Sequence, residues 1–296
     1  MSPVLDHGPQ SAGSTQHPAE LARAYERIAK LEAELRWSQR MTKLTQRLLA
    51  GEVAFKGVIK KVLGMKPAPV ADFHDPDYQR YTKRRLEHLA SLGLNISGAS
   101  VLELGAGIGD LTDFFLDRGC RVVATEVRPE SRDILRNRYK DLDVRELDLD
   151  NPGNAVKSDE MFDIVFCYGV LYHLSKPDEG IRYMAAHSRS MLLLETRVSF
   201  GQEASVNPYP EVSDSPTQSS TGGGCRPTRP WVFAELKKHF PYVYLPISQP
   251  HRAHFVTDWT VQPVEDILAN SVFVASRNKL PGHMLVEDVP LRQIRS

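Results

Sequence analysis

The stretch "VLELGAGIGDLT", residues 101–112, places three glycines directly after an apolar run. The apolar run predicts a buried strand, and a glycine-rich turn after such a strand usually binds a cofactor. Gly105, Gly107 and Gly109 have the spacing G-x-G-x-G, whereas a dinucleotide-binding turn has G-x-G-x-x-G. Asp110 stands where that pattern has its last glycine. A carboxylate there would repel a pyrophosphate at close range, so the stretch favours a cofactor that has none.

Helix and strand patterns alternate on both sides of this turn. Strands are predicted at "SVLELG", "CRVVATE", "LDVRELDLD", "FDIVFCYGVL", "RSMLLLETRV", "YVYLPI" and "SVFVASR". Helices are predicted at "DYQRYTKRRLEHLASLG", "IGDLTDFFLDRG", "PESRDILRNRYK" and "KPDEGIRYMAAHS". This succession indicates an α/β fold, a Rossmann-like and mostly parallel sheet with helices on both faces.

An N-terminal helical segment precedes this domain. Residues 1–18 are rich in Ser, Gly, Pro and His, which predicts a disordered tail. Residues 19–66 have helical character and short heptad runs, so the helix could associate with a second copy or lie against its own domain. Its end, "FKGVIKKVLGMK", is basic and amphipathic, which suits an anionic membrane or polyanion as well as a solvated helix. The prolines of residues 67–76 predict a linker.

The main domain is expected to cover residues 77–280, followed by a C-terminal tail over 281–296. Residues 199–230 interrupt it with more than 30 residues that show no periodicity. Loops of this length inside a compact domain are usually functional or disordered. The segment follows a strand at the edge where open α/β sheets bind ligands. We therefore interpret 199–230 as a substrate lid, with disorder as the alternative, and call it the lid segment.

Composition narrows the class of protein. The 296 residues contain 37 Lys plus Arg and 37 Asp plus Glu, a balance that disfavours nucleic-acid binding by bulk charge. Cys120, Cys167 and Cys225 have no metal-binding spacing, which is typical of reduced thiols in a cytosolic protein. No apolar run reaches transmembrane length. The sequence therefore predicts a cytoplasmic protein, with peripheral membrane attachment through the N-terminal segment as an alternative.

Three acidic residues accompany the glycine turn. Glu103 lies on the strand before it, Glu126 ends the second strand, and Asp148 ends the third. A carboxylate at the second position can accept from ribose hydroxyls, and one at the third can accept from an adenine amino group. S-adenosylmethionine (SAM) has ribose, adenine and positive charge but no phosphate. Its single carboxylate can use the backbone N–H groups of the turn.

The sequence resembles the class I SAM-dependent methyltransferases. The resemblance rests on "VLELGAGIGDLT", "VVATEVRPE", "VRELDLDNP" and "FDIVFCYGVLYHLSKPDE", and covers roughly residues 78–200. It implies a seven-stranded sheet with one antiparallel strand. It also implies a SAM site formed by Glu103, Gly105, Ala106, Gly107, Gly109, Glu126, Val127, Asp148, Leu149, Tyr168 and Gly169.

His173 is the predicted catalytic base. Methyl transfer is an in-line displacement, and a hydroxyl acceptor must lose its proton as the new bond forms. A histidine can accept that proton near neutral pH. His173 follows the fourth predicted strand in "GVLYHL", and Tyr172 beside it could orient the acceptor. The alternative for His173 is a role in packing or in positioning a loop.

Polar and aromatic residues after the fifth predicted strand suggest a saccharide acceptor. Tryptophan stacks on sugar faces while Arg and His bond hydroxyl groups. The candidates are Arg226, Arg229, Trp231, His251 and His254. Trp231 and Trp259 suit the core equally well. His251, His254 and Asp258 could instead bind a divalent metal, although their spacing is loose.

The function predicted from the sequence is O-methylation of a saccharide or a glycosylated small molecule. One alternative is a methyltransferase that acts on tRNA or another macromolecule docked by the basic N-terminal segment. The short stretch "GVLYHLSKP" also resembles tRNA wobble-uridine-modifying enzymes. A second alternative is a non-catalytic SAM-binding scaffold that forms homo-oligomers or complexes through its N-terminal helix. The sequence does not identify the acceptor.

Overall fold

The computed structural model describes residues 73–211, 213, 218–262 and 269–296. The predictions for residues 1–18 and 19–66, and for the linker up to residue 72, lie outside the described residues. α4 (Pro76–Ser91) opens the described domain. Asp75 caps this helix, because its carboxylate accepts hydrogen bonds from the amides of Asp77 and Tyr78.

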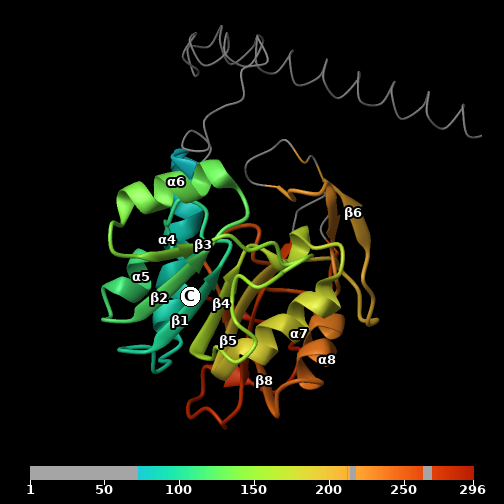
Figure 1. The fold of residues 1–296 in the computed structure, drawn as a ribbon. Helices are drawn as coiled ribbons and strands as arrows, with labels where there is room; N and C mark the ends of the chain where they lie inside the picture. The colour runs from blue at the N-terminus through green and yellow to red at the C-terminus, as the bar shows by residue number, and fades with distance from the viewer. Residues whose placement is uncertain (1–72, 212, 214–217, 263–268) are drawn as a thin grey trace, which may run out of the picture. The chain divides into compact units, whose positions relative to one another are not determined.

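One sheet of eight strands forms the centre of the domain, in the order β11-β8-β10-β5-β4-β1-β2-β3 (Figure 1). Its members are β1 (Ser100–Leu104), β2 (Arg121–Thr125), β3 (Asp143–Arg145), β4 (Phe162–Tyr168), β5 (Ser188–Val198), β8 (Tyr242–Pro246), β10 (Ala269–Ser276) and β11 (Leu285–Val286). β1 to β5 are parallel to one another, whereas β10 is antiparallel to both β5 and β8. The predicted Rossmann-like fold is confirmed.

The eighth strand departs from the expected seven. Leu285 and Val286 pair with Pro246 and Leu245 at the edge of β8. The last residues are also bound to the domain, because β12 (Ile294–Arg295) pairs with β9 (Ser248–Gln249). Residues 281–296, expected to be a tail, therefore add one strand to the large sheet and one to a separate two-stranded sheet.

Helices cover both faces of the sheet (Figure 1). One buried cluster joins the sheet to α4, to the short α5 (Asp113–Leu116) and to α6 (Pro129–Arg138). The other joins it to α7 (Pro177–His187) and α8 (Arg229–Lys237). From Ile164 to Tyr168, successive residues of β4 alternate between the two clusters, as the two-residue period of a strand requires.

Two predicted elements differ from the structure. The helix expected over "IGDLTDFFLDRG" is mostly turn, and only Asp113–Leu116 is α-helical. The lid segment contains a short hairpin of β6 (Pro208–Pro210) and β7 (Gly223–Cys225), whose proline and glycine content hid the strand pattern. A 3₁₀ turn, η1 (Leu171–His173), follows β4.

Both the backbone conformation and the limited space around it require glycine at position 109. Its φ is +91°, and a Cβ there would lie 2.6 Å from both Leu135 Cδ1 and Tyr139 Cε2. Gly119 has a similar φ of +69°, but a Cβ there would meet nothing within 4 Å. A comparison of alanine substitutions at the two positions thus distinguishes the cost of backbone strain from the cost of steric overlap.

We expect Gly119→Ala to lower the free energy of unfolding by about 1 kcal/mol, the cost of a left-handed non-glycine residue. Gly109→Ala should cost about 2–3 kcal/mol more, because Leu135 and Tyr139 must also move. Urea unfolding of the two variants measures both values. Equal losses would contradict the steric contribution at Gly109.

Candidate functional site

A cavity of about 550 Å³ lies at the carboxyl ends of β1, β2, β4 and β5. This volume is within the usual range for small-molecule sites, about 300–1,000 Å³. Its walls come from the glycine turn after β1, from α4, from η1 and from Ser219 and Ser220 of the lid segment. The carboxyl edge of a parallel sheet is where α/β folds bind ligands.

The glycine turn is anchored by Glu126. One carboxylate oxygen of Glu126 accepts a hydrogen bond from the amide of Gly107 at 2.9 Å, and the other accepts from the amide of Arg128 at 2.9 Å. Burial raises the pKa of Glu126, although these two amide bonds oppose the rise. Gly105 approaches the next loop closely, since a Cβ there would lie 2.4 Å from Val170 Cγ2. The turn therefore lies directly against the loop that follows β4.

Glu103 lies behind this turn and does not line the cavity. Its carboxylate accepts a hydrogen bond from Thr112 Oγ1 at 2.7 Å, and its other oxygen has no partner within the described structure. Complete burial raises the pKa of Glu103 to about 8. Gly109 does not line the cavity either. Gly105, Ala106 and Gly107 of the same turn do.

The remaining residues predicted to bind the cofactor lie along the cavity wall. They are Val127, Asp148, Leu149, Tyr168 and Gly169. Asp150, next to this set, accepts hydrogen bonds from the amides of Ser175 and Lys176 at the start of α7. The loop after β3 is thereby joined to the loop after η1.

Asp110 lies at the cavity edge, where its charge is partly neutralised. Arg138 of α6 forms an ion pair with one carboxylate oxygen at 2.7 Å, and Gln79 of α4 donates to the other at 3.0 Å. Because residues up to 112 form turns, α5 begins too late to present its N-terminus beside Gly109. The turn thus lacks the helix terminus that holds a pyrophosphate in dinucleotide-binding folds.

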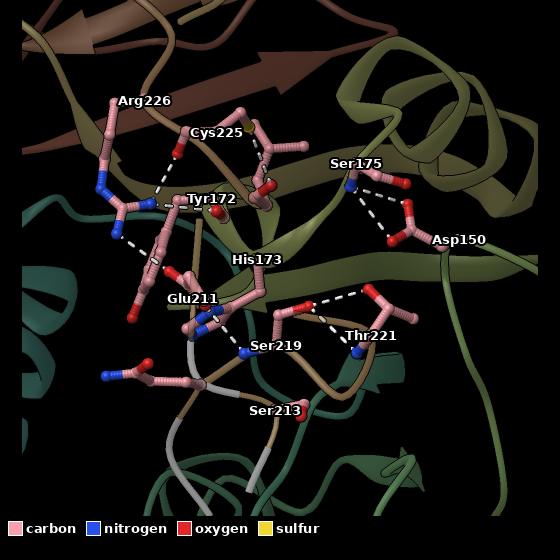
Figure 2. A network of polar contacts seen from close by, with 12 residues as sticks. Asp150, Tyr172, His173, Ser175, Glu211, Ser213, Ser219, Thr221, Cys225 and Arg226 are labelled. Atoms are coloured by element: carbon pink, nitrogen blue, oxygen red, sulfur yellow. Dashed lines mark hydrogen bonds and ion pairs between the residues drawn. The ribbon is translucent and has the colours of Figure 1, made fainter. Parts of the chain in front are cut away.

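His173 forms a dyad with Glu211 of the lid segment (Figure 2). His173 Nδ1 bonds Glu211 Oε2, and Nε2 has no hydrogen-bond partner in the described residues. Glu211 also accepts from the amide of Ser219 at 2.8 Å and from Arg226 at 2.9 Å. Burial opposes ionisation of Glu211, but these bonds hold its pKa at about 2.

The protonation state of His173 follows from its surroundings. Its side chain is 16% exposed, and burial lowers its pKa below 6.5 even though the Glu211 carboxylate raises it. At neutral pH the ring is therefore uncharged. With Nδ1–H donating to the carboxylate, Nε2 holds a free electron pair.

The residues that α4 contributes to the cavity wall were not predicted from the sequence. α4 contributes Tyr78, Tyr81 and Arg85, which are three and four positions apart and so share one helix face. Arg85 forms a buried ion pair with Glu195 of β5 at 3.2 Å. A pattern of aromatic and basic residues on the buried side of an amphipathic helix could have indicated this wall.

A family model described as a methyltransferase domain matches residues 102–190. An uncharacterized methyltransferase of Exiguobacterium sibiricum is 33% identical over 107 residues, which are 36% of this chain and 48% of that protein. The chain thus spans about half the length of this curated relative.

Two solved structures are similar to this chain. The N-terminal domain of EvdMO1, solved in the presence of SAH and D-fucose, is 18% identical with a TM-score of 0.48, over 69% of this chain and 84% of that one. Magnesium protoporphyrin IX methyltransferase (ChlM) from Synechocystis PCC 6803, with bound SAM, is 14% identical with a TM-score of 0.43, over 68% and 80% of the two chains.

Four of the five predicted acceptor residues lie away from the cavity. Arg226 supports Glu211 from outside, and Arg229 lies over the ring of Trp259 and donates to the carbonyl of Pro290 at 2.8 Å. Trp231 packs against the core, and His251 is exposed. His254 alone of the five lines the cavity, which Tyr172 and His173 also line.

The described residues contain no group of three His, Cys, Asp or Glu side chains placed to hold a metal ion. Asp258, the proposed third ligand, instead accepts from Thr260 and pairs with Arg292. No helix in the described part of the chain is long and apolar enough to cross a membrane. The three cysteines are buried and unpaired.

The buried carboxyl group of Glu103 should make the stability of the domain depend on pH. Its pKa is higher in the folded than in the unfolded chain, so the stability it contributes at acidic pH is lost as the pH rises toward 8. Glu103→Gln does not titrate and should be more stable than wild type at pH 8 by about 1–3 kcal/mol. The gap should shrink toward pH 5.

Urea unfolding at both pH values measures this difference. Glu130→Gln, which changes an exposed carboxylate on α6, serves as the control and should follow the wild type. If the wild type has a higher free energy of unfolding than Glu103→Gln at pH 8, then Glu103 is ionised and stabilises the fold.

Proposed function

We propose that this chain is a SAM-dependent methyltransferase that methylates a hydroxyl group of a saccharide or glycosylated small molecule. The observation that carries the proposal is the His173–Glu211 dyad on the wall of the cavity that the glycine turn and Glu126 also line. The methyltransferase-domain match over residues 102–190 supports the class of reaction.

The residues of the cavity fit SAM. The backbone of Gly105–Gly107 is open to the cavity, and added Cβ atoms at Gly105 and Gly107 would lie 2.4 Å from Val170 and 3.1 Å from Phe73. Glu126 would accept from ribose hydroxyls, Asp148 and Leu149 would meet the adenine, and Tyr168 has a buried hydroxyl without a partner. When bound, SAM supplies an electrophilic methyl group.

His173 would act on the acceptor. Its Nε2 takes the proton from the hydroxyl as the oxygen becomes a nucleophile, a contribution of about 10²–10⁴-fold. Glu211 holds the ring through Nδ1 and stabilises the imidazolium that forms. Tyr172, whose ring lies 4.0 Å from that of His173, limits the directions from which the acceptor can approach.

Calorimetry with S-adenosylhomocysteine (SAH) and NAD tests the cofactor. We expect the full chain to bind SAH and not NAD. Glu126→Ala should weaken SAH binding by about 1–3 kcal/mol, because it removes a buried acceptor. Glu130→Ala changes an exposed residue four positions further on and is the matched control. Binding of NAD in preference to SAH would refute the proposed cofactor.

The pH profile of methyl transfer tests the base, using radiolabelled SAM and the best acceptor from a saccharide panel. The wild-type rate should rise with pH, with the midpoint of the rise below pH 6.5, since burial lowers the pKa of His173. His173→Ala should lower kcat by about 10²-fold or more and lose this limb, with SAH affinity within about threefold. His239→Ala, which changes a histidine off the cavity wall, is the control.

Glu211→Gln separates a positioning role from a structural one. Because the Glu211 carboxylate raises the pKa of His173, its loss should move the acidic limb to lower pH while kcat falls by about tenfold. Full activity of His173→Ala would place the base elsewhere, with His254 next on the cavity wall. SAH binding without transfer to any acceptor would favour the scaffold alternative.

A further inference from the structure

Arg197 lies on the cavity wall and forms no hydrogen bond or ion pair with the described residues. It lies near the carboxyl end of β5, opposite Asn270 of β10, and its guanidinium lies 4.8 Å from the centre of the Tyr172 ring. The side chain lines the cavity and is half-buried. Burial opposes its charge, but Tyr172, Tyr81 and the carboxylates of Glu195 and Glu211 raise the pKa of the guanidinium from a distance.

Three nearby arginines each pair with a carboxylate: Arg85 with Glu195 at 3.2 Å, Arg226 with Glu211 at 2.9 Å, and Arg252 with Asp77 at 2.7 Å. Arg128 of the cavity wall donates instead to backbone carbonyls of the lid segment. The guanidinium of Arg197 thus keeps its N–H donors unused within the described residues, and their planar fork suits an anion. An anion that enters the cavity would supply the missing partner.

We infer that the acceptor carries an anionic group, a carboxylate or a phosphate, which Arg197 binds while His173 acts on a hydroxyl of the same molecule. This inference rests on the proposed function and specifies its substrate class. Guanidinium binds both anions through two parallel hydrogen bonds. Tyr172 links the proposed base to the proposed anion-binding residue, since its ring contacts both His173 and Arg197.

Arg197 lies too far from the glycine turn to bind the carboxylate of SAM, the proposed methyl donor. The glycine turn follows β1, and β5 is two strands away in the sheet order. Neighbouring strands are about 4.8 Å apart, so this separation is roughly 10 Å. The donor's carboxylate would lie at the turn, where backbone amides are available, and Arg197 would face the acceptor instead.

Thermal unfolding of the SAH-loaded full chain tests the inference with three probes at equal ionic strength: D-glucuronate, D-glucose 6-phosphate and D-glucose. At least one anionic probe should raise the wild-type melting temperature, and glucose should not. Comparison of the two anions tells a carboxylate from a phosphate acceptor. Arg197→Gln should weaken binding of that anion by about 10- to 100-fold, the loss of one charge-assisted pair.

Arg189→Gln is the matched control, because Arg189 lies at the opposite end of β5 and its side chain is 56% exposed. It should keep the wild-type response to the anion. The SAH affinity of Arg197→Gln should stay within about threefold of wild type. The inference is overturned if neither anion stabilises the wild type, or if Arg197→Gln responds as the wild type does.

Two further outcomes separate this inference from the proposed function. Loss of SAH affinity in Arg197→Gln would assign the arginine to the donor and overturn the inference, with the proposed reaction intact. Failure of the wild type to bind SAH would overturn the proposed function itself, and the inference with it.

Discussion

The buried ion pair between Arg85 and Glu195 connects the parts of the domain that build the cavity. The two side chains are 4% and 0% exposed, and they join α4 to the middle of the sheet. Glu195 also accepts from Tyr81 and from Asn270 of β10, so three elements meet at one carboxylate. Removing one partner of such a pair costs about 3–5 kcal/mol, because the other charge is left buried alone. The position of the cavity wall that α4 forms therefore depends on this ion pair.

The sheet was predictable because its signal is local. Buried strands appear as short apolar runs, and the alternation with helices determines a parallel sheet. The elements that escaped prediction have weak local signals: the proline- and glycine-rich hairpin of β6 and β7, and the two-residue strand β11. Pairing with β8 makes Leu285–Val286 a strand, and nothing in two residues alone would show that.

The site was predictable in part for the same reason. Glu126, Asp148 and the glycine turn follow predicted strands, so their common edge could be inferred from the order of the strands. Arg85 and Glu195 are 110 positions apart, and only the fold brings them together. Strand position placed Glu103 near the turn, but which way its carboxylate points is set by Thr112.

The dyad that orients His173 spans two separate segments, since Glu211 belongs to the lid segment and His173 to the turn after β4. The ring therefore keeps this partner only while the two segments stay in contact. In the proposed reaction, an imidazolium without Glu211 would lose the negative charge that stabilises it. The base is thus assembled from two distant parts of the chain, and its strength depends on the contact between them.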